Sequence, residues 1–352
     1  MSALRWAVAA VVLGIVALAA GLEAAGFDAA TALGSLWLGA FGSWDAFTSA
    51  TLVRAVPLVI IGLGIAIAFR GGALNIGAEG QFYAGAIAAT WIGLHVGGLP
   101  QIVAVTILLG AAATAGLLWV VVPVWLKLRF GVLEVISTLL LNFVAVSLVS
   151  LMVQGPLQEH EGIYPQSESI AEAARLPLLL PGSRLHAGLL IALAGGVILW
   201  FVFSRTLWGF RLRAVGLGPR AAEVSGRVDS QRMGAVALLL SGAIAGLAGG
   251  IELSGVSYAL FQNLSPGYGF TGIAVALLGG LHPIGVIVAG ILFGALQAGA
   301  VAMQREAGVP AVAAHVVEAV IIIVALLATA PRGGWTSLRG AVRRRIGTKA
   351  PA

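Results

Sequence analysis

Ten long apolar runs occupy most of this 352-residue chain and constrain its fold more than any other feature. A helix needs about 20 apolar residues to cross the roughly 30 Å hydrocarbon core of a bilayer. The runs lie at 6–22, 51–69, 76–96, 99–122, 132–153, 186–203, 233–253, 268–281, 284–301 and 315–330. We therefore predict an all-α, polytopic integral membrane protein with about ten transmembrane helices, in which residues 1–352 form a single transmembrane domain.

The amino-acid composition agrees with a membrane protein. Hydrophobic residues make up 59% of the chain and charged residues only 10%, whereas soluble domains carry about 25% charged residues. Small residues let membrane helices approach closely, and the spacing of Gly242, Gly246 and Gly250 predicts such packing, as does that of Gly290 and Gly294. The chain has no cysteine, which excludes disulfides, thiolate metal sites and thiol nucleophiles.

The basic residues predict the orientation, because cytoplasmic loops carry an excess of Lys and Arg. With the N-terminus inside, 16 of the 20 basic residues are cytoplasmic. We therefore predict cytoplasmic termini, an extracytoplasmic loop at 154–185, a cytoplasmic loop at 204–232 and a basic cytoplasmic tail at 332–352. The first loop packs over the mouth of a pathway, receives a partner, or is a solvated connector. In the second loop, Pro219 begins a short helix that Gly226 would end.

A polar, glycine-broken segment at residues 70–81 lies between two of the apolar runs. It holds Asn75, Glu79 and Gln81. Non-helical backbone occurs in a membrane only where protein or a water-filled cavity covers it, and an intramembrane ionisable residue is a candidate functional residue. These side chains therefore either line a permeant pathway or tie helices together. A neighbouring helix N-terminus near Glu79 would favour its negative charge.

Residues 267–276 weakly repeat residues 80–89, the stretch in which apolar sequence resumes after the polar segment. Asn263 and Asn75 precede the two stretches at nearly equal distances. The two stretches would enter the membrane from opposite sides, as in transporters built from inverted repeats with broken helices. We therefore predict broken helices, including a half helix in the run at 268–281, and an inverted repeat. Chance similarity between helices rich in Gly and Ala is the alternative.

Motifs for enzymatic chemistry are missing from the sequence. It has no phosphate-binding loop of the Gly-x-x-x-x-Gly-Lys-Ser/Thr type and no Gly-x-Ser-x-Gly nucleophile elbow. Its five histidines are scattered, and none has the i, i+4 spacing of a metal site. We therefore predict no catalytic residue and no metal site in this chain.

Four stretches carry a resemblance to a known family: residues 75–81 (Asn-Ile-Gly-Ala-Glu-Gly-Gln), 134–142 (Glu-Val-Ile-Ser-Thr-Leu-Leu-Leu-Asn), 213–226, and 267–279 (Gly-Tyr-Gly-Phe-Thr-Gly-Ile-Ala-Val-Ala-Leu-Leu-Gly). Together they resemble the permease subunits of bacterial ABC importers of the nucleoside and simple-sugar type. These belong to a wider set that includes branched-chain amino acid and ribose permeases. The order and spacing of the stretches extend the resemblance over most of the chain.

The resemblance implies a permease subunit in the bacterial cytoplasmic membrane, without its own ATPase motif or cofactor. A cytoplasmic ABC ATPase would bind ATP and Mg. Other partners would be a second, homologous permease subunit forming a heterodimer, an extracytoplasmic solute-binding lipoprotein and membrane lipid, but no nucleic acid. The residues that would couple to the ATPase are Pro219, Arg220, Ala221, Ala222 and Glu223. Those of the substrate pathway would be Asn75, Glu79, Gln81, Phe82, Asn142, Tyr268, Phe270 and Thr271.

The function that we predict is inward movement of a nucleoside, or a related simple sugar, by an ATP-driven importer. The aromatic residues of the pathway could face a base, and its amides could pair with polar edges. A sugar or a flavin-like ring would satisfy the same residues. Two other classes stay open: an ion-coupled secondary transporter of a small polar solute, and a structural or assembly membrane protein.

Overall fold

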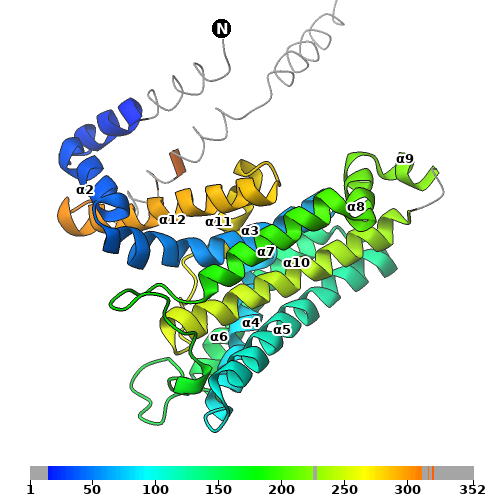
Figure 1. The fold of residues 1–352 in the computed structure, drawn as a ribbon, viewed down its shortest axis with the longest axis horizontal. Coiled ribbons are helices and arrows are strands. Elements are labelled where there is room, and N and C mark those ends of the chain that lie inside the picture. Colours follow the sequence, from blue (N-terminus) through cyan, green and yellow to red (C-terminus); the bar gives the residue numbers. More distant parts are fainter. Residues whose placement is uncertain (1–14, 225–227, 311–315, 317–318, 321–352) are drawn as a thin grey trace, which may run out of the picture. The chain divides into compact units, whose positions relative to one another are not determined.

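The computed structural model describes residues 15–224, 228–310, 316 and 319–320 (Figure 1). Two compact units are present: residues 1–34 with 303–352, and residues 35–302. Within the described residues the regular structure is helical, apart from two isolated β-bridges. Elements of the N-terminal half are a helix at Ile15–Ala24, α2 (Ala29–Phe41), η1 (Ala46–Leu52), α3 (Val53–Arg70), α4 (Ala78–His95), α5 (Gln101–Phe130) and α6 (Glu134–Val153). Those that follow are η2 (Glu172–Ala174), α7 (Gly188–Arg205), α8 (Leu207–Leu217), α9 (Pro219–Val224), α10 (Ser230–Glu252), η3 (Leu253–Ser257), α11 (Tyr268–Leu278) and α12 (Pro283–Glu306).

Six helices of the described residues are long and apolar enough to cross a membrane. They are Ala46–Arg70, Gln101–Phe130, Glu134–Val153, Gly188–Arg205, Ser230–Ser257 and Pro283–Glu306. The prediction of an all-α, polytopic membrane protein is confirmed, whereas the count of about ten spans stays a prediction. The run at 268–281 is the short helix α11, as expected of a half helix. Most of the run at 315–330 lies outside the described residues.

The helix α10 packs directly against α4 and α5 through glycine. A Cβ atom on Gly246 would lie 2.8 Å from the Cα atom of Gly116 in α5, and one on Gly249 would overlap the carbonyl group of Phe82 in α4. Backbones that approach this closely leave no room for a side chain. The close packing predicted from the glycine spacing of α10 is therefore confirmed.

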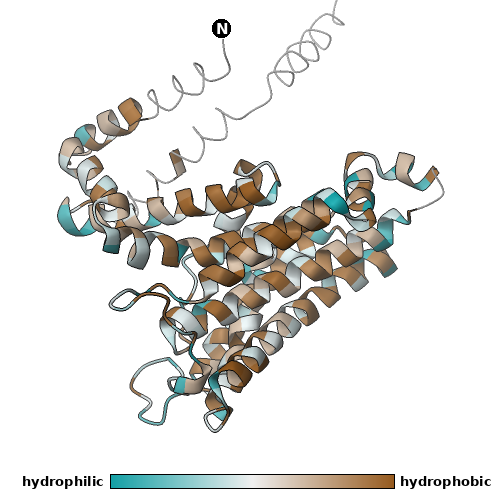
Figure 2. Ribbon diagram, in the orientation of Figure 1, coloured by the Kyte–Doolittle hydropathy of each residue, from teal (hydrophilic) through white to brown (hydrophobic). Residues whose placement is uncertain are grey.

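The helices of the second unit run between two ends with different character. One end, here called the loop end, carries residues 154–187, and the other carries α8 and α9 (Figure 1). Polar residues gather in the loops and around α8 and α9, while the helices between them are mostly apolar (Figure 2). This distribution is the one expected of a bundle that lies in a bilayer.

The loop at 154–187 is packed onto the bundle rather than solvated throughout. Ser167 is 1% exposed and its N–H donates to the carbonyl oxygen of Leu260, at 2.8 Å. The N–H of Ala171 donates to the carbonyl oxygen of Gly93 near the end of α4, and that of Leu176 donates to the carbonyl oxygen of Ser254. The loop is therefore not a solvated connector throughout, while its role at the mouth of a pathway or in receiving a partner stays a prediction.

Candidate functional site

The segment between α3 and α4 turns back into the bundle without forming a helix. It leaves α3 after Arg70, turns at Gly72 with φ +75°, and reaches the first residue of α4 at Ala78. Near the start of α4, Gly80 bonds Asn142, which lies eight residues into α6. At 1.5 Å per residue, α4 therefore begins about 12 Å along α6. The backbone is covered by protein here, as a membrane requires.

Asn75 is the centre of a buried amide cluster. Its Nδ2 donates to Gln81 Oε1 and to Ser241 Oγ, each at 2.8 Å. Its Oδ1 accepts from Gln81 Nε2 and from the N–H of Gly77, each at 3.0 Å. Asn75 and Ser241 are fully buried and Gln81 is 1% exposed. Since an asparagine side chain offers two donors and two acceptor lone pairs, protein groups use its full hydrogen-bonding capacity.

Asn142 fixes the start of α4 from a different helix. Its Oδ1 accepts from the N–H of Gly80 at 2.8 Å, and its Nδ2 donates to the carbonyl oxygen of Ile76 at 2.9 Å. Both partners are backbone groups that the helix ladder of α4 does not pair. The side chain therefore acts as a cap that extended backbone needs when it lies among helices.

Glu79 joins the beginnings of α4 and α11. Its Oε2 accepts from the N–H of Gly269, the second residue of α11, at 2.6 Å. The expectation that a helix N-terminus would favour the charge of Glu79 is met by this contact. A Cβ atom on Gly269 would lie 2.5 Å from the Cα atom of Glu79, so only glycine allows the two helix starts to meet. The carboxylate is 5% exposed.

Aromatic side chains lie beside Glu79. The rings of Phe82 and Tyr268 are 5.9 Å apart, and Phe82 is fully buried while Tyr268 is 6% exposed. Phe270 faces outward, with 47% exposure, and Thr271 is half-buried. The eight predicted pathway residues thus fall into an amide group around Asn75, a group around Glu79 with Phe82 and Tyr268, and two residues at the surface of α11.

Two polar residues at the site were not predicted. Ser241 completes the amide cluster from α10, and Glu252 lies 6% exposed at the loop end of the same helix. The positive charges of Arg54 and Arg184 act on Glu252. Glu252 could have been found from the sequence, because it is a carboxylate near the end of an apolar run. Ser241 could not, because a serine in a helix rich in Gly and Ala does not stand out. Within the described residues, no cluster of His, Asp and Glu could hold a metal ion.

The helices α8 and α9 form a hairpin that contacts the other side of the polar segment. Gly216 packs on the carbonyl group of Arg70, and the guanidinium of Arg70 lies 4.7 Å from the ring centroid of Phe203. Arg213 Nη1 donates to the carbonyl oxygen of Phe203 at 2.7 Å. Movement of the hairpin would therefore bear on the residue from which the segment starts.

The tip of this hairpin is exposed. Pro219, Arg220, Ala221 and Glu223 face solvent, whereas Ala222 is 6% exposed and lines a cavity of about 490 Å³ between α8 and α9. Leu217, the last residue of α8, and Val224, the last residue of α9, are 91% and 88% exposed. The short helix predicted to begin at Pro219 is confirmed, while Gly226, its predicted end, lies outside the described residues. Two exposed apolar residues of this size at one tip indicate an interaction surface.

Comparison with known proteins identifies the family. A family model described as "Branched-chain amino acid transport system / permease component" matches residues 47–326. The chain is 38% identical to the guanosine ABC transporter permease protein NupP of Bacillus subtilis, covering 89% of this chain and 90% of the relative. It is 38% identical to the glucose ABC transporter permease protein TsgB13 of Haloferax volcanii, covering 77% and 74%. It is 30% identical to a second guanosine permease protein of Bacillus subtilis, NupQ, covering 70% and 79%. The chain therefore belongs to the family of branched-chain amino acid transport system permease components, and is a membrane-spanning ABC transporter permease rather than an ATPase.

Proposed function

We propose that this permease moves a nucleoside inward across the bacterial cytoplasmic membrane as one subunit of an ATP-driven importer. The observation that carries the proposal is the similarity to a guanosine permease over 89% of the chain, which includes every candidate site residue. A simple sugar is the second candidate, because the similarity to a glucose permease is equally high where the chains overlap. Family membership leaves little reason to invoke an ion-coupled mechanism.

The partners follow from the same comparisons and from the exposed surfaces. A cytoplasmic ABC ATPase, which binds ATP and Mg, docks on the tip of the α8–α9 hairpin. A second, homologous permease completes the pathway, since Bacillus subtilis has two guanosine permease proteins that both resemble this chain. An extracytoplasmic solute-binding lipoprotein delivers the solute at the loop end. Both termini are cytoplasmic in this arrangement.

Within the pathway, the two groups of residues have different roles. Asn75, Gln81 and Asn142 bond protein groups, so they hold the segment and the start of α4 in place. Glu79 and Tyr268, together with Phe270 and Thr271 on α11, are the candidates for contact with the solute, and the ring of Phe82 packs against that of Tyr268. This division assigns specificity to the meeting point of α4 and α11.

Uptake measurements test the function. A strain that lacks this permease should lose uptake of radiolabelled guanosine and regain it when the gene is restored. Glucose uptake in the same pair of strains tests the sugar alternative. Guanosine uptake that does not depend on the permease, together with glucose uptake that does, would transfer the assignment to a sugar. If uptake of neither guanosine nor glucose depends on the permease, both assignments are refuted.

Coupling to the ATPase is tested on the exposed face of α9. Ala221→Arg should abolish uptake and ATPase co-purification without loss of permease from the membrane, because it adds bulk and charge to the docking surface. Ala221→Ser is the matched control and should behave as wild type. We avoid Ala222 because it is buried in the hairpin. Normal uptake by Ala221→Arg would refute docking at this tip.

Orientation is tested by labelling, which the lack of cysteine makes simple. Cysteine at Tyr164, which is 63% exposed in the loop, should react with an impermeant maleimide in intact cells. Cysteine at Leu217, at the hairpin tip, should react only after the cells are opened. The reverse pattern would invert the topology.

A further inference from the structure

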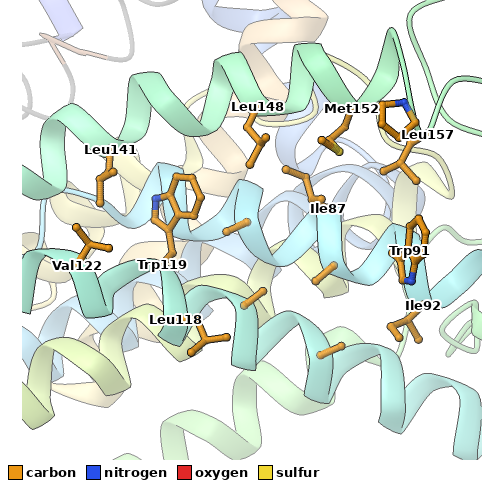
Figure 3. A pocket seen from close by; sticks show the side chains of 15 residues that line it. Ile87, Trp91, Ile92, Leu118, Trp119, Val122, Leu141, Leu148, Met152 and Leu157 are labelled. Atoms are coloured by element: carbon orange, nitrogen blue, oxygen red, sulfur yellow. The ribbon is translucent and has the colours of Figure 1, made fainter.

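A lateral groove lies between α4, α5 and α6, and its inner end adjoins the candidate site (Figure 3). Its volume is about 590 Å³. Trp91, Pro156 and Leu157 stand at its loop-end mouth, and Trp119, Val122 and Leu141 at its other end. The lining is apolar throughout, apart from the indole nitrogens and backbone groups. Water would find few partners in such a groove.

The length of the groove matches one leaflet of a bilayer. On α6 the lining extends from Leu141 to Met152, and on α5 from Ala111 to Val122. Eleven residues of helix rise about 16 Å, which is about half of a hydrocarbon core roughly 30 Å thick. On the 20-residue helix α6 this stretch lies toward the loop end, and on the 30-residue helix α5 it lies in the middle. The groove is therefore about as long as one leaflet is thick.

The described protein leaves the groove open on its outer side. Leu118 is 60% exposed, Trp91 is 55% exposed and Val122 is 49% exposed. In the apolar windows of α5 and α6, only 22% and 28% of residues are buried. An acyl chain is apolar, slender and one leaflet long.

We propose that the lateral groove binds an acyl chain of a phospholipid from the leaflet at the loop end. Near the mouth the rings of Trp91 and His95 are in tilted contact, with centroids 5.0 Å apart, and amphipathic aromatic rings of this kind lie at the level of lipid headgroups. The bound chain extends from this pair toward Trp119. The partner is thus a membrane lipid, recognised by shape and hydrophobicity.

The inner end of the groove is the back wall of the amide cluster. A Cβ atom on Gly80 would lie 3.0 Å from Trp119 Nε1, from Asn142 Oδ1 and from the carbonyl oxygen of Leu141. Trp119 Nε1 itself is buried without a hydrogen-bond partner. The indole ring also lines the groove, so a bound chain packs against it. An occupied groove therefore steadies the residues that fix the start of α4.

Quenching by brominated phospholipid tests the proposal on the full-length permease in detergent. Phospholipid brominated near the end of its acyl chain should quench tryptophan fluorescence saturably, at a few equivalents of lipid. The saturable part of the loss of tryptophan fluorescence should be absent in Trp119→Phe. Ala115→Phe and Ala88→Phe fill the groove from two helices and should weaken binding about tenfold or more, since excluding even two methylene groups costs about that much affinity.

Ala113→Phe is the matched control, because Ala113 lies on α5 outside the groove lining, and it should bind lipid as wild type. Elution position on gel filtration shows which variants are folded. If a filling variant fails to fold, Trp119→Phe and the other filling variant still decide the test. Quenching that Trp119→Phe leaves unchanged, or that grows without saturation, would overturn the proposal. So would loss of the bound lipid when the second permease assembles, since a partner helix would then occupy the groove.

Discussion

The pair formed by Asn75 and Gln81 offers the sharpest test of how the polar segment is held. The two amides exchange two hydrogen bonds in a site that is at most 1% exposed. Gln81→Leu leaves one buried N–H of Asn75 without a partner, while Asn75 Oδ1 keeps the N–H of Gly77. An orphaned buried group costs about 1–3 kcal/mol, so we expect the free energy of unfolding to fall by about 1–3 kcal/mol.

Replacing both residues should cost little more than replacing Asn75 alone. Asn75→Leu orphans both polar atoms of Gln81 as well as the groups of Gly77 and Ser241 that it bonded. In the double variant Gln81 is also apolar, so its two orphaned atoms are gone. The expected coupling energy is about 2 kcal/mol, compared with about 0.6 kcal/mol for an average interhelical hydrogen bond in a membrane.

A double-mutant cycle compares the wild type, the two single variants and the double variant. The free energy of unfolding of each is measured in mixed micelles titrated with SDS and followed by circular dichroism. Gln154→Leu is the control, because its bond to Ser150 on α6 is exposed and its loss should cost under about 0.5 kcal/mol. Uptake is measured alongside on variants that retain normal abundance. Additive effects of the two changes, with coupling below about 0.5 kcal/mol, would refute the reciprocal pair as the support of this segment.

Three further predictions concern other parts of the molecule. Gly246→Ala should lower the free energy of unfolding by about 1–3 kcal/mol because its Cβ meets the backbone of α5, whereas Gly110→Ala, where nothing lies within 4 Å, should be neutral or stabilising in the same titration. Lys127→Met removes the 2.7 Å ion pair from partly buried Glu134 and should cost about 1–2 kcal/mol, a loss that Lys127→Arg should largely avoid in unfolding experiments. Burial, with the nearby charge of Arg184, lowers the pKa of His186 from 6.5 to about 4. The unfolded state then binds the proton first, so stability falls by up to about 3 kcal/mol as the pH drops from about 6.5 to 4, and His186→Asn should flatten this slope relative to wild type.

The sequence predicted the helical membrane class and the broken helix at 268–281 because both depend on local composition. Long apolar runs can only be helices in lipid when they are not closed barrels, and a short run after Pro266 and Gly267 leaves room only for a half helix. The polar segment was also found because amides and a carboxylate are rare within apolar sequence. Features of this kind can be predicted because they depend on the local sequence and not on which distant segments pack together.

Partners far apart in sequence could not be predicted. Ser241 bonds Asn75 across 166 residues, and Gly269 bonds Glu79 across 190. Serine and glycine are common in membrane helices for packing alone, so nothing local marks these two. The burial of Ala222 could not be predicted either. The face of the six-residue helix α9 that is buried depends on how this helix packs against α8. The run at 76–96 became α4, which is not one of the six strongly apolar helices because Glu79, Gln81 and His95 lower its hydropathy.

The contacts also explain why the polar segment is not a helix. A continuous helix through residues 71–77 would satisfy its own backbone and have no need of Asn142 or Asn75. Because this stretch is extended, its backbone groups must be bonded by side chains of α6 and by the Asn75 cluster, while Gly216 of the hairpin packs on Arg70 at its beginning. One segment thus contacts, at one end, the hairpin whose tip is proposed to dock the ATPase and, through Glu79, the start of α11 at the other. If the hairpin moves during transport, this segment is the covalent path by which the displacement reaches Glu79.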